Sequence, residues 1–242
     1  PMRADLVGIS LAVEGSQGYY IPVGHNPGMG KQLPLKDVLE ALRGPLTDPR
    51  IQKAGHNLKY DFIMLARQGL RTAPLSFDTM IAEWLTNPAS HNLGLKNLAW
   101  VRLNLSMTEI QALIGSGKNQ RSMAEVPVVD AAAYAAADAA AVMQLIPHLR
   151  AELEAGPGLR LLEEIEMPLV SVLADMEMTG ISLDTSFLAQ MSAELATRLA
   201  EIETQVYELV GQPFNINSTQ QLSQALFERL KLSPPDRTRR TE

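Results

Sequence analysis

The hydrophobic pattern of the chain changes at the segment 154–158, which reads Glu-Ala-Gly-Pro-Gly. Before this segment, short apolar runs are followed by amphipathic stretches, which is the pattern of strands alternating with helices. After it, apolar residues recur every three or four positions, which is typical of helices alone. Because glycine and proline interrupt regular structure, we place a linker here. The sequence therefore predicts an α/β domain over residues 1–154 and an all-helical domain over residues 159–242.

The first domain is predicted to open with a β-hairpin, whose strands at 6–13 and 19–23 flank a glycine-containing turn. A third short strand is expected at 51–55, and the expected helices are 35–42, 58–67, 79–85, 95–103, 108–114 and 129–154. The second domain is predicted to hold two long amphipathic helices in an antiparallel hairpin, and a third helix capped by Asn217 or Ser218. The apolar positions that indicate the first of these helices are Leu162, Ile165, Leu169, Leu173 and Met176.

Composition excludes several classes of protein. No run of eighteen apolar residues exists, which argues against a membrane span. The chain has no cysteine, so disulfide scaffolds, thiolate metal sites and cysteine nucleophiles are excluded, and a reducing cytoplasm is the expected compartment. No Gly-x-Ser-x-Gly, Walker or dinucleotide motif is present. The net charge of −6 is not that of a generally basic nucleic-acid binder, although an acidic metal site that acts on DNA would fit it.

Two blocks carry the remaining candidate chemistry. Asn57 and Asp61 follow a predicted strand directly, whereas Tyr134 and Asp138 lie four residues apart on the predicted helix 129–154 and so share one face. The alanines around them leave that face shallow, which gives a bulky substrate room to approach. The alternative is structural, with Asp61 favouring a helix N-terminus and Tyr134 serving as a core aromatic. Taken separately, neither block decides between the two interpretations.

Taken together, the blocks are more specific. An Asn-x-x-x-Asp after a strand, followed 138 − 61 = 77 residues later by a Tyr-x-x-x-Asp, resembles two of the three motifs of the DEDD exonucleases, and the tyrosine selects the DEDDy branch. Further segments in the same order resemble the bacterial DNA polymerase I family (family A), and they are 55–61, 77–80, 117–120, 165–170, 176–181 and 214–218.

The resemblance implies an RNase H-like exonuclease fold, a mixed sheet with flanking helices. It assigns residues 1–154 to a 3′–5′ proofreading exonuclease domain and residues 159–242 to the beginning of the polymerase thumb. The family's first motif, an Asp-x-Glu on the first strand, has no counterpart before Asp5. We therefore expect that strand and two metal-binding carboxylates to be missing from this chain, and the chain as it stands to be inactive.

The resemblance also implies a mechanism. Two divalent ions, Mg²⁺ or Mn²⁺, roughly 3.5–4 Å apart, would activate a water and stabilise the leaving oxygen. Asp138 would bind the first ion, Asp61 would help to hold the second, and Tyr134 would orient the water. Asn57 would support the site or the 3′-terminal nucleotide. Without the Asp-x-Glu pair, binding of these ions should be weakened.

The implied partners are DNA and the remainder of a polymerase chain, with a single-stranded 3′ end at the exonuclease site and duplex at the thumb. Near the C-terminus Arg237, Arg239 and Arg240 reverse the acidic balance of the chain and are predicted to contact duplex phosphates, although an ordinary solvated end is the alternative. No membrane partner is expected. The implied location is the bacterial cytoplasm, in association with the nucleoid.

Three alternatives stay open. An RNase D-like RNA exonuclease would share the carboxylates, but the thumb-like helices argue against it. A catalytically dead scaffold domain of a polymerase would not need to keep Asp61, Tyr134 and Asp138 together. Residues 159–230 could also be a plain helical interaction module, whose apolar stripes form a partner interface.

Overall fold

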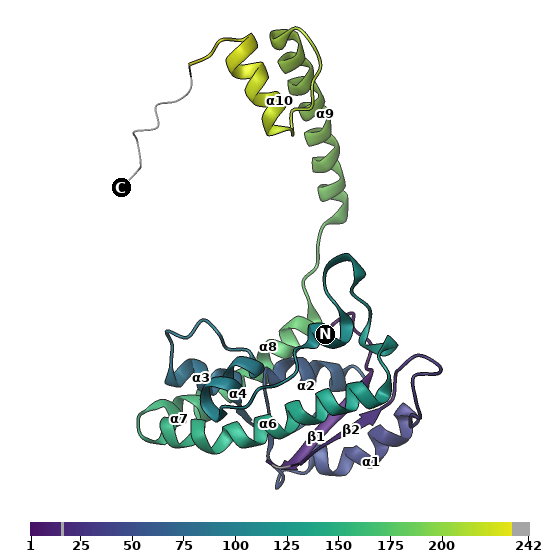
Figure 1. Cartoon of the computed structure of the whole chain (residues 1–242), viewed down its shortest axis with the longest axis vertical. Coiled ribbons are helices and arrows are strands. Elements are labelled where there is room, and N and C mark those ends of the chain that lie inside the picture. Colours follow the sequence, from purple (N-terminus) through teal and green to yellow (C-terminus); the bar gives the residue numbers. More distant parts are fainter. Residues whose placement is uncertain (16, 234–242) are drawn as a thin grey trace. The chain divides into compact units, whose positions relative to one another are not determined.

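The computed structural model describes residues 1–15 and 17–233 of the chain. These residues form two compact units, which divide between Gly180 and Ile181. The first unit contains all four described strands and the helices α1 to α8, and the second contains α9 and α10 (Figure 1).

The first unit begins with the predicted hairpin. Strand β1 (Gly8–Glu14) pairs antiparallel with β2 (Gln17–Pro22), with Ile9 opposite Ile21. The long helix α6 (Val128–Glu154) lies across both strands (Figure 1). At Gly18 the helix comes so close that an added Cβ atom would stand 1.9 Å from the carbonyl oxygen of Ala136. The alanines of α6 therefore serve its close packing against the hairpin.

A second pair of strands follows. Strands β3 (Lys53–Gly55) and β4 (Leu75–Asp78) pair in parallel, and helix α2 (Leu58–Ala66) lies between them in sequence. The α/β fold class is confirmed, but among the described residues the strands form two separate two-stranded sheets in place of one mixed sheet. Strand β4 was not predicted from the sequence.

Helices α1 (Leu35–Thr47), α3 (Thr79–Thr86), α4 (Leu95–Leu103) and α5 (Ile110–Ile114) match predicted helices to within a few residues, except that α1 continues through Pro45 to Thr47. The first unit also contains the 3₁₀ turns η1 (Gly117–Asn119) and η2 (Met123–Glu125), α7 (Gly158–Leu161), the π-helical turn η3 (Leu162–Glu166) and α8 (Met167–Thr179).

Helix α6 is the centre of the main core. One face of it buries Leu145, Leu149 and Leu153, which meet side chains of α2, β4 and α4. Among the described residues α6 is the one helix whose length and mean hydropathy, 1.3 over the most apolar window, would also suit a membrane. Its buried leucines and its contacts with strands and helices identify it as the core helix of this domain.

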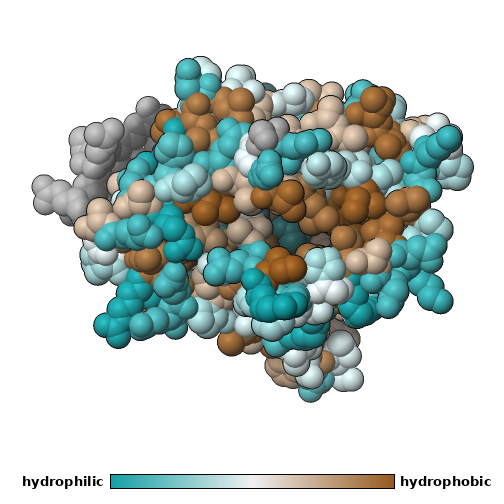
Figure 2. Space-filling model, turned by 90° about the horizontal axis from the view of Figure 1, so that it is seen from below, coloured by the Kyte–Doolittle hydropathy of each residue, from teal (hydrophilic) through white to brown (hydrophobic). Residues whose placement is uncertain are grey.

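The face that helix α8 buries differs from the one predicted from the spacing of apolar residues in the sequence. Its buried residues are Met167, Val170 and Ala174, and Ala174 packs against Phe62 and Ile63 of α2. Most of the apolar positions used for the prediction are exposed, namely Ile165, Leu169, Leu173 and Met176. The π-helical turn η3 explains the difference, because an i→i+5 turn shifts every later position around the helix axis. On the face seen in the space-filling view, apolar side chains form several patches between hydrophilic ones (Figure 2).

The second unit is helical, but it begins at Ile181 and not after the predicted linker at 154–158. Helix α8, which was predicted as the first helix of this domain, belongs to the first unit. Helix α9 (Thr185–Val210) is capped by Asp184, whose Oδ1 accepts the backbone N–H of Phe187 at 2.8 Å, and it ends at Gly211 with φ of 83°. Ser218 caps the next helix, α10 (Thr219–Ser223), which continues into the π-helical turn η4 (Gln224–Arg229). No side chain of α9 is buried.

The close approach at Gly18 can be tested by substitution. We expect Gly18→Ala to lower the free energy of unfolding by about 2 kcal/mol, because the new methyl group forces α6 away from the hairpin. Gly156→Ala is the control, since nothing lies within 4 Å of its Cβ position. Urea unfolding followed by circular dichroism measures both variants. Equal stability of the two would contradict the packing described here.

Candidate active site

The buried carboxylate of Asp78 organises the region around the first predicted block. Asp78 is the last residue of β4, is 2% exposed, and accepts backbone N–H groups from two helices. At the start of α2, Oδ1 accepts from Asn57 at 3.1 Å and Oδ2 accepts from Leu58 at 2.7 Å. At the start of α3, Oδ1 accepts from Met80 at 2.8 Å. One side chain therefore caps both helices, and its charge lies at the positive ends of both helix dipoles.

Asn57 lies at the N-cap of α2 in the left-handed conformation, with φ of 58° and ψ of 49°. Asparagine tolerates this conformation better than most residues. The turn is what brings the Asn57 and Leu58 N–H groups to Asp78. The side chain of Asn57 is exposed and makes no capping hydrogen bond. Its predicted role in substrate binding stays a prediction.

Asp61 lies one turn further along α2, and the residue is exposed. Surrounding protein atoms nevertheless remove part of the water from its carboxyl group, and this desolvation raises the pKa of Asp61 to about 6. The negative charge of Asp78 adds to the effect. Asp61 is thus a carboxylate in a negative environment, which favours either a proton or a cation beside it.

Tyr134 and Asp138 lie on one face of α6, as the spacing of four predicts, and a lysine joins them. The ammonium of Lys96, on α4, donates to Asp138 Oδ1, and it stands 4.1 Å from the centre of the Tyr134 ring. The side chains of Lys96 and Asp138 are 16% and 23% exposed, so this ion pair is largely shielded from water. The sequence analysis missed Lys96, since it precedes Asp138 by 42 positions and no local motif links them.

The environment of this group is acidic. Burial raises the pKa of Tyr134 to about 12, and the negative charges of Asp138 and Glu109 add to the shift. Burial also raises the pKa of Asp138, whereas the ammonium of Lys96 opposes that rise. At neutral pH the Tyr134 hydroxyl therefore keeps its proton, and the ammonium of Lys96 favours the charged form of Asp138.

His56 connects the two blocks electrostatically. Its Nδ1 lies 3.0 Å from Thr79 Oγ1, and that hydroxyl donates to Gly55 O, so Nδ1 carries the proton. Its Nε2 is buried without a hydrogen-bond partner. Burial lowers the pKa of His56, and the charges of Asp78 and Lys96 act on it in opposite directions. The His56 ring is thus neutral at pH 7 and is within electrostatic range of both Asp78 and Lys96.

The position of Lys96 depends on how α4 is held. Arg102, near the end of α4, pairs with the buried Glu83 of α3 at 2.9 Å and with Glu152 of α6 at 2.5 Å. The guanidinium therefore ties three helices together. It fixes α4 against the same helix that carries Tyr134 and Asp138.

The donor set does not match the two divalent ions that the resemblance implies. Among residues 1–15 and 17–233, no group of three or more His, Asp or Glu side chains could hold a metal ion. Mg²⁺ and Mn²⁺ require several oxygen ligands, and the carboxylate of Asp138 already accepts an ammonium proton. The residues present therefore do not fit a two-metal site.

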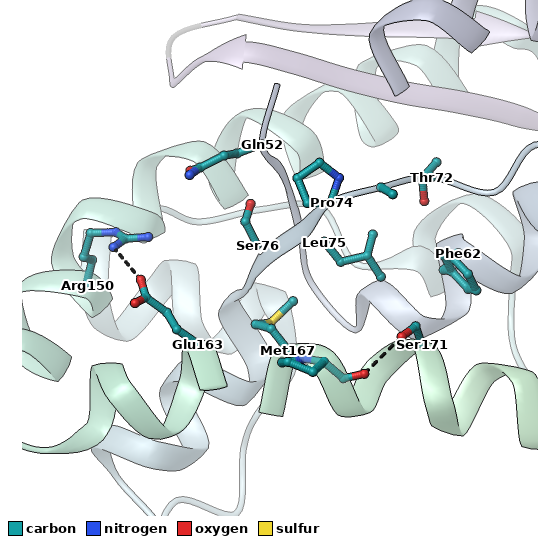
Figure 3. Close-up of a pocket in the computed structure, with 12 residues that line it drawn as sticks. Gln52, Phe62, Thr72, Pro74, Leu75, Ser76, Arg150, Glu163, Met167 and Ser171 are labelled. Carbon is teal, nitrogen blue, oxygen red and sulfur yellow. Dashed lines mark hydrogen bonds and ion pairs between the residues drawn. The ribbon is translucent and has the colours of Figure 1, made fainter. Parts of the chain in front are cut away.

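A separate cavity of about 450 Å³ lies beside β4 (Figure 3). Leu75 and Ser76 line one side of it, and Met167 and Ser171 of α8 line the other. Arg150 and Glu163 form an ion pair of 3.4 Å at its end. None of the four predicted residues Asn57, Asp61, Tyr134 and Asp138 lines this cavity. The other predicted substrate contacts, Arg237, Arg239 and Arg240, lie outside the described residues.

Removal of the Asp78 carboxylate should be far more costly than removal of an ordinary cap. We expect Asp78→Ala to lower the free energy of unfolding by at least about 3 kcal/mol, since it leaves buried N–H groups of two helices without acceptors. Ser122→Ala is the control, because Ser122 caps only the short turn η2, and we expect it to cost about 1 kcal/mol. Urea titration provides both values, and similar losses would show that Asp78 is a single-helix cap.

The raised pKa of Asp61 gives a pH dependence with a defined sign. Folded Asp61 holds its proton up to about pH 6, whereas in the unfolded chain its pKa returns to the ordinary value of 3.8. Stability from this group is therefore complete below about pH 4 and is lost as the pH rises through 6. We expect Asp61→Asn to raise the free energy of unfolding at pH 7.5 by about 1 kcal/mol, after allowance for screening by water, and to change it little at pH 4.5. Chemical unfolding in EDTA measures this, and a gain of equal size at both pH values would contradict it.

Comparison with known proteins agrees with this organisation. The family model described as 3′-5′ exonuclease matches residues 1–154, and the family model described as DNA polymerase family A matches residues 185–242. DNA polymerase I of Chloroflexus aurantiacus is 44% identical over 237 residues, covering 97% of this chain and 25% of that protein. DNA polymerase I of Pseudomonas aeruginosa is 35% identical over 234 residues, covering 95% of this chain and 26% of that protein.

A solved structure extends the likeness to three dimensions. The POL domain of Pol1 from M. smegmatis, in complex with DNA primer-template and dNTP, has a TM-score of 0.71 and 26% sequence identity, covering 98% of this chain and 36% of that chain. The chain thus spans about a quarter of the length of the curated relatives it matches. The order of the two matched regions is the order predicted from the motifs. The chain belongs to the DNA polymerase I family, and it carries that family's 3′–5′ exonuclease domain followed by part of its family A polymerase domain.

Proposed function

We propose that this chain is a segment of a bacterial DNA polymerase. It contains the exonuclease-type domain, residues 1–154, followed by the beginning of the thumb, residues 159–242. The observation that carries the proposal is the succession of the two family matches along one chain. The same succession disfavours an RNase D-like RNA exonuclease, which would share only the first region. The proposed location is the bacterial cytoplasm.

DNA is the proposed partner of both regions. The similar Pol1 domain from M. smegmatis is in complex with DNA primer-template, which supports duplex binding by the thumb region here. In the exonuclease-type domain, we propose that the Tyr134 hydroxyl and the exposed side chain of Asn57 contact a single-stranded 3′ end. The proposed duplex contacts of Arg237, Arg239 and Arg240 rest on their charge in the sequence alone.

For catalysis, the proposal is that this chain binds a 3′ end without hydrolysing it. In an active member of the family, divalent ions would activate water and stabilise the leaving oxygen. Here Asp138 and Asp61 are the proposed ligands, but they do not make up a sufficient donor set with the residues around them. The residues of this chain can bind and orient a 3′ end, because Tyr134 keeps its proton at neutral pH and so remains a hydrogen-bond donor.

A scaffold role for residues 1–154 is the second candidate. It is favoured by the shielded ion pair between Lys96 and Asp138, which ties α4 to α6 as a structural contact would. The two candidates differ in DNA binding, since a scaffold does not require affinity for a 3′ end.

Incubation with a 5′-labelled single-stranded oligonucleotide tests the proposal. We expect no shortening of the oligonucleotide in Mg²⁺ or Mn²⁺, because loss of part of a metal site removes several kcal/mol of transition-state stabilisation, which is many orders of magnitude in rate. We also expect binding that weakens as salt rises, measured by fluorescence anisotropy.

Asp138→Ala is the control for contaminating nucleases. Shortening by the unchanged chain that disappears in Asp138→Ala would contradict the proposed inactivity. Either of two results would favour the scaffold role instead. One is the absence of any salt-dependent binding by the unchanged chain, and the other is binding that Tyr134→Phe combined with Asn57→Ala leaves unaffected.

A further inference from the structure

We infer that Lys96 is the resident cation of the Tyr134–Asp138 site, and that its ammonium occupies the position from which a divalent ion would contact Asp138. The inference rests on the proposed assignment of residues 1–154 as an exonuclease-type domain, because that assignment is the reason to expect a divalent ion here. The ion pair itself does not depend on the assignment.

The first argument is geometric. The Lys96 ammonium meets Asp138 Oδ1 and also stands over the Tyr134 ring, 4.1 Å from its centre. A cation over a tyrosine ring is attracted by its π electrons, so two groups of the site hold the ammonium at once. A divalent ion that binds Asp138 at this oxygen would have to displace it.

The second argument concerns shielding. The lysine and aspartate side chains are 16% and 23% exposed, whereas the pair of Lys59 with Glu177 elsewhere in the first unit is 33% and 41% exposed. Charges that are removed from water interact more strongly and are less screened by salt. Lys96 is also tethered to the site, so its local concentration far exceeds that of a free metal ion. Displacement of Lys96 is therefore costly.

The third argument is the acidity of the surroundings. Asp138 and Glu109 place negative charge near Tyr134, and the described residues hold no group of three potential ligands. One ammonium balances this charge without the several oxygen ligands that Mg²⁺ or Mn²⁺ needs. Without Lys96, however, the same acids would attract a divalent ion. The site thus keeps the electrostatic character of a cation site and supplies the cation from its own chain.

Paramagnetic line broadening by Mn²⁺ provides the test, because it detects even weak binding and does not require activity. We titrate the full 242-residue chain with MnCl₂ and follow the backbone amide signals of Tyr134 and Asp138 by NMR. In the unchanged chain we expect these signals to persist at Mn²⁺ concentrations at which Lys96→Met loses them. The expected difference in concentration is at least about tenfold, which corresponds to about 1.4 kcal/mol.

Matched variants distinguish the loss of the positive charge at Lys96 from other effects of the substitution. Lys96→Arg keeps the positive charge and should behave like the unchanged chain. Lys59→Met removes a lysine from the more exposed pair with Glu177 and should also leave the Tyr134 and Asp138 signals unaffected. Lys96→Met combined with Asp138→Asn should lose the gain in Mn²⁺ sensitivity, because the attracting carboxylate is gone.

Two results would overturn the inference. One is equal broadening at Tyr134 and Asp138 in the unchanged chain and in Lys96→Met. The other is broadening of these signals in the unchanged chain at low Mn²⁺ that Asp138→Asn abolishes. This second result does not depend on a lysine variant, so it remains informative even if Lys96→Met fails to fold. Such broadening without DNA shortening would overturn only this inference, whereas loss of DNA binding without broadening would overturn only the proposed function.

Discussion

The positions of Asn57 and Asp61, the first block of the site, depend on the hydrogen bonds that the buried carboxylate of Asp78 accepts. Because it accepts N–H groups from the starts of both α2 and α3, it fixes these two helices to the end of β4 and to each other. Asn57 and Asp61 therefore take their positions from a residue that performs no proposed chemistry. The same charge has a cost at Asp61, whose pKa it helps to raise, so the capping of the helices and the electrostatics of the site are not independent.

Positively charged side chains with largely buried partners join other elements of the first unit, although the chain as a whole is acidic. The ammonium of Lys53 donates to three backbone carbonyls at 2.6 to 2.7 Å, and Arg102 joins two glutamates on different helices. Lys96 is also a largely shielded positive charge with a compensating partner, but its partner, Asp138, is a residue of the candidate site. A buried charge is tolerated only where partners compensate it, and these three side chains each meet that condition in a different way.

The sequence predicts those features that local patterns carry. The spacing of Tyr134 and Asp138 places them on one helical face because α6 is regular over that stretch, and Ser218 caps α10 as its residue type indicates. Features that depend on long-range contacts were missed. Strand β4 was not predicted, and its Asp78 has the local sequence context of an N-cap for α3 alone, although it also accepts N–H groups from the start of α2. The buried face of α8 differs from the apolar spacing because the π-helical turn η3 shifts the register, which no composition pattern signals.

The ion pair of Lys96 with Asp138 affects both the stability of the fold and the capacity of Asp138 to bind a metal ion. A carboxylate enclosed on α6 without a counter-charge would oppose folding, so the largely shielded Asp138 of this chain needs a cation nearby. A lysine from α4 meets that need, and Arg102 on the same helix keeps α4 in place. A cation that belongs to the chain is present in every folded molecule, whereas a divalent ion must first be bound from solution. We therefore infer that the contact that packs α4 on α6 also weakens the binding of a metal ion by Asp138.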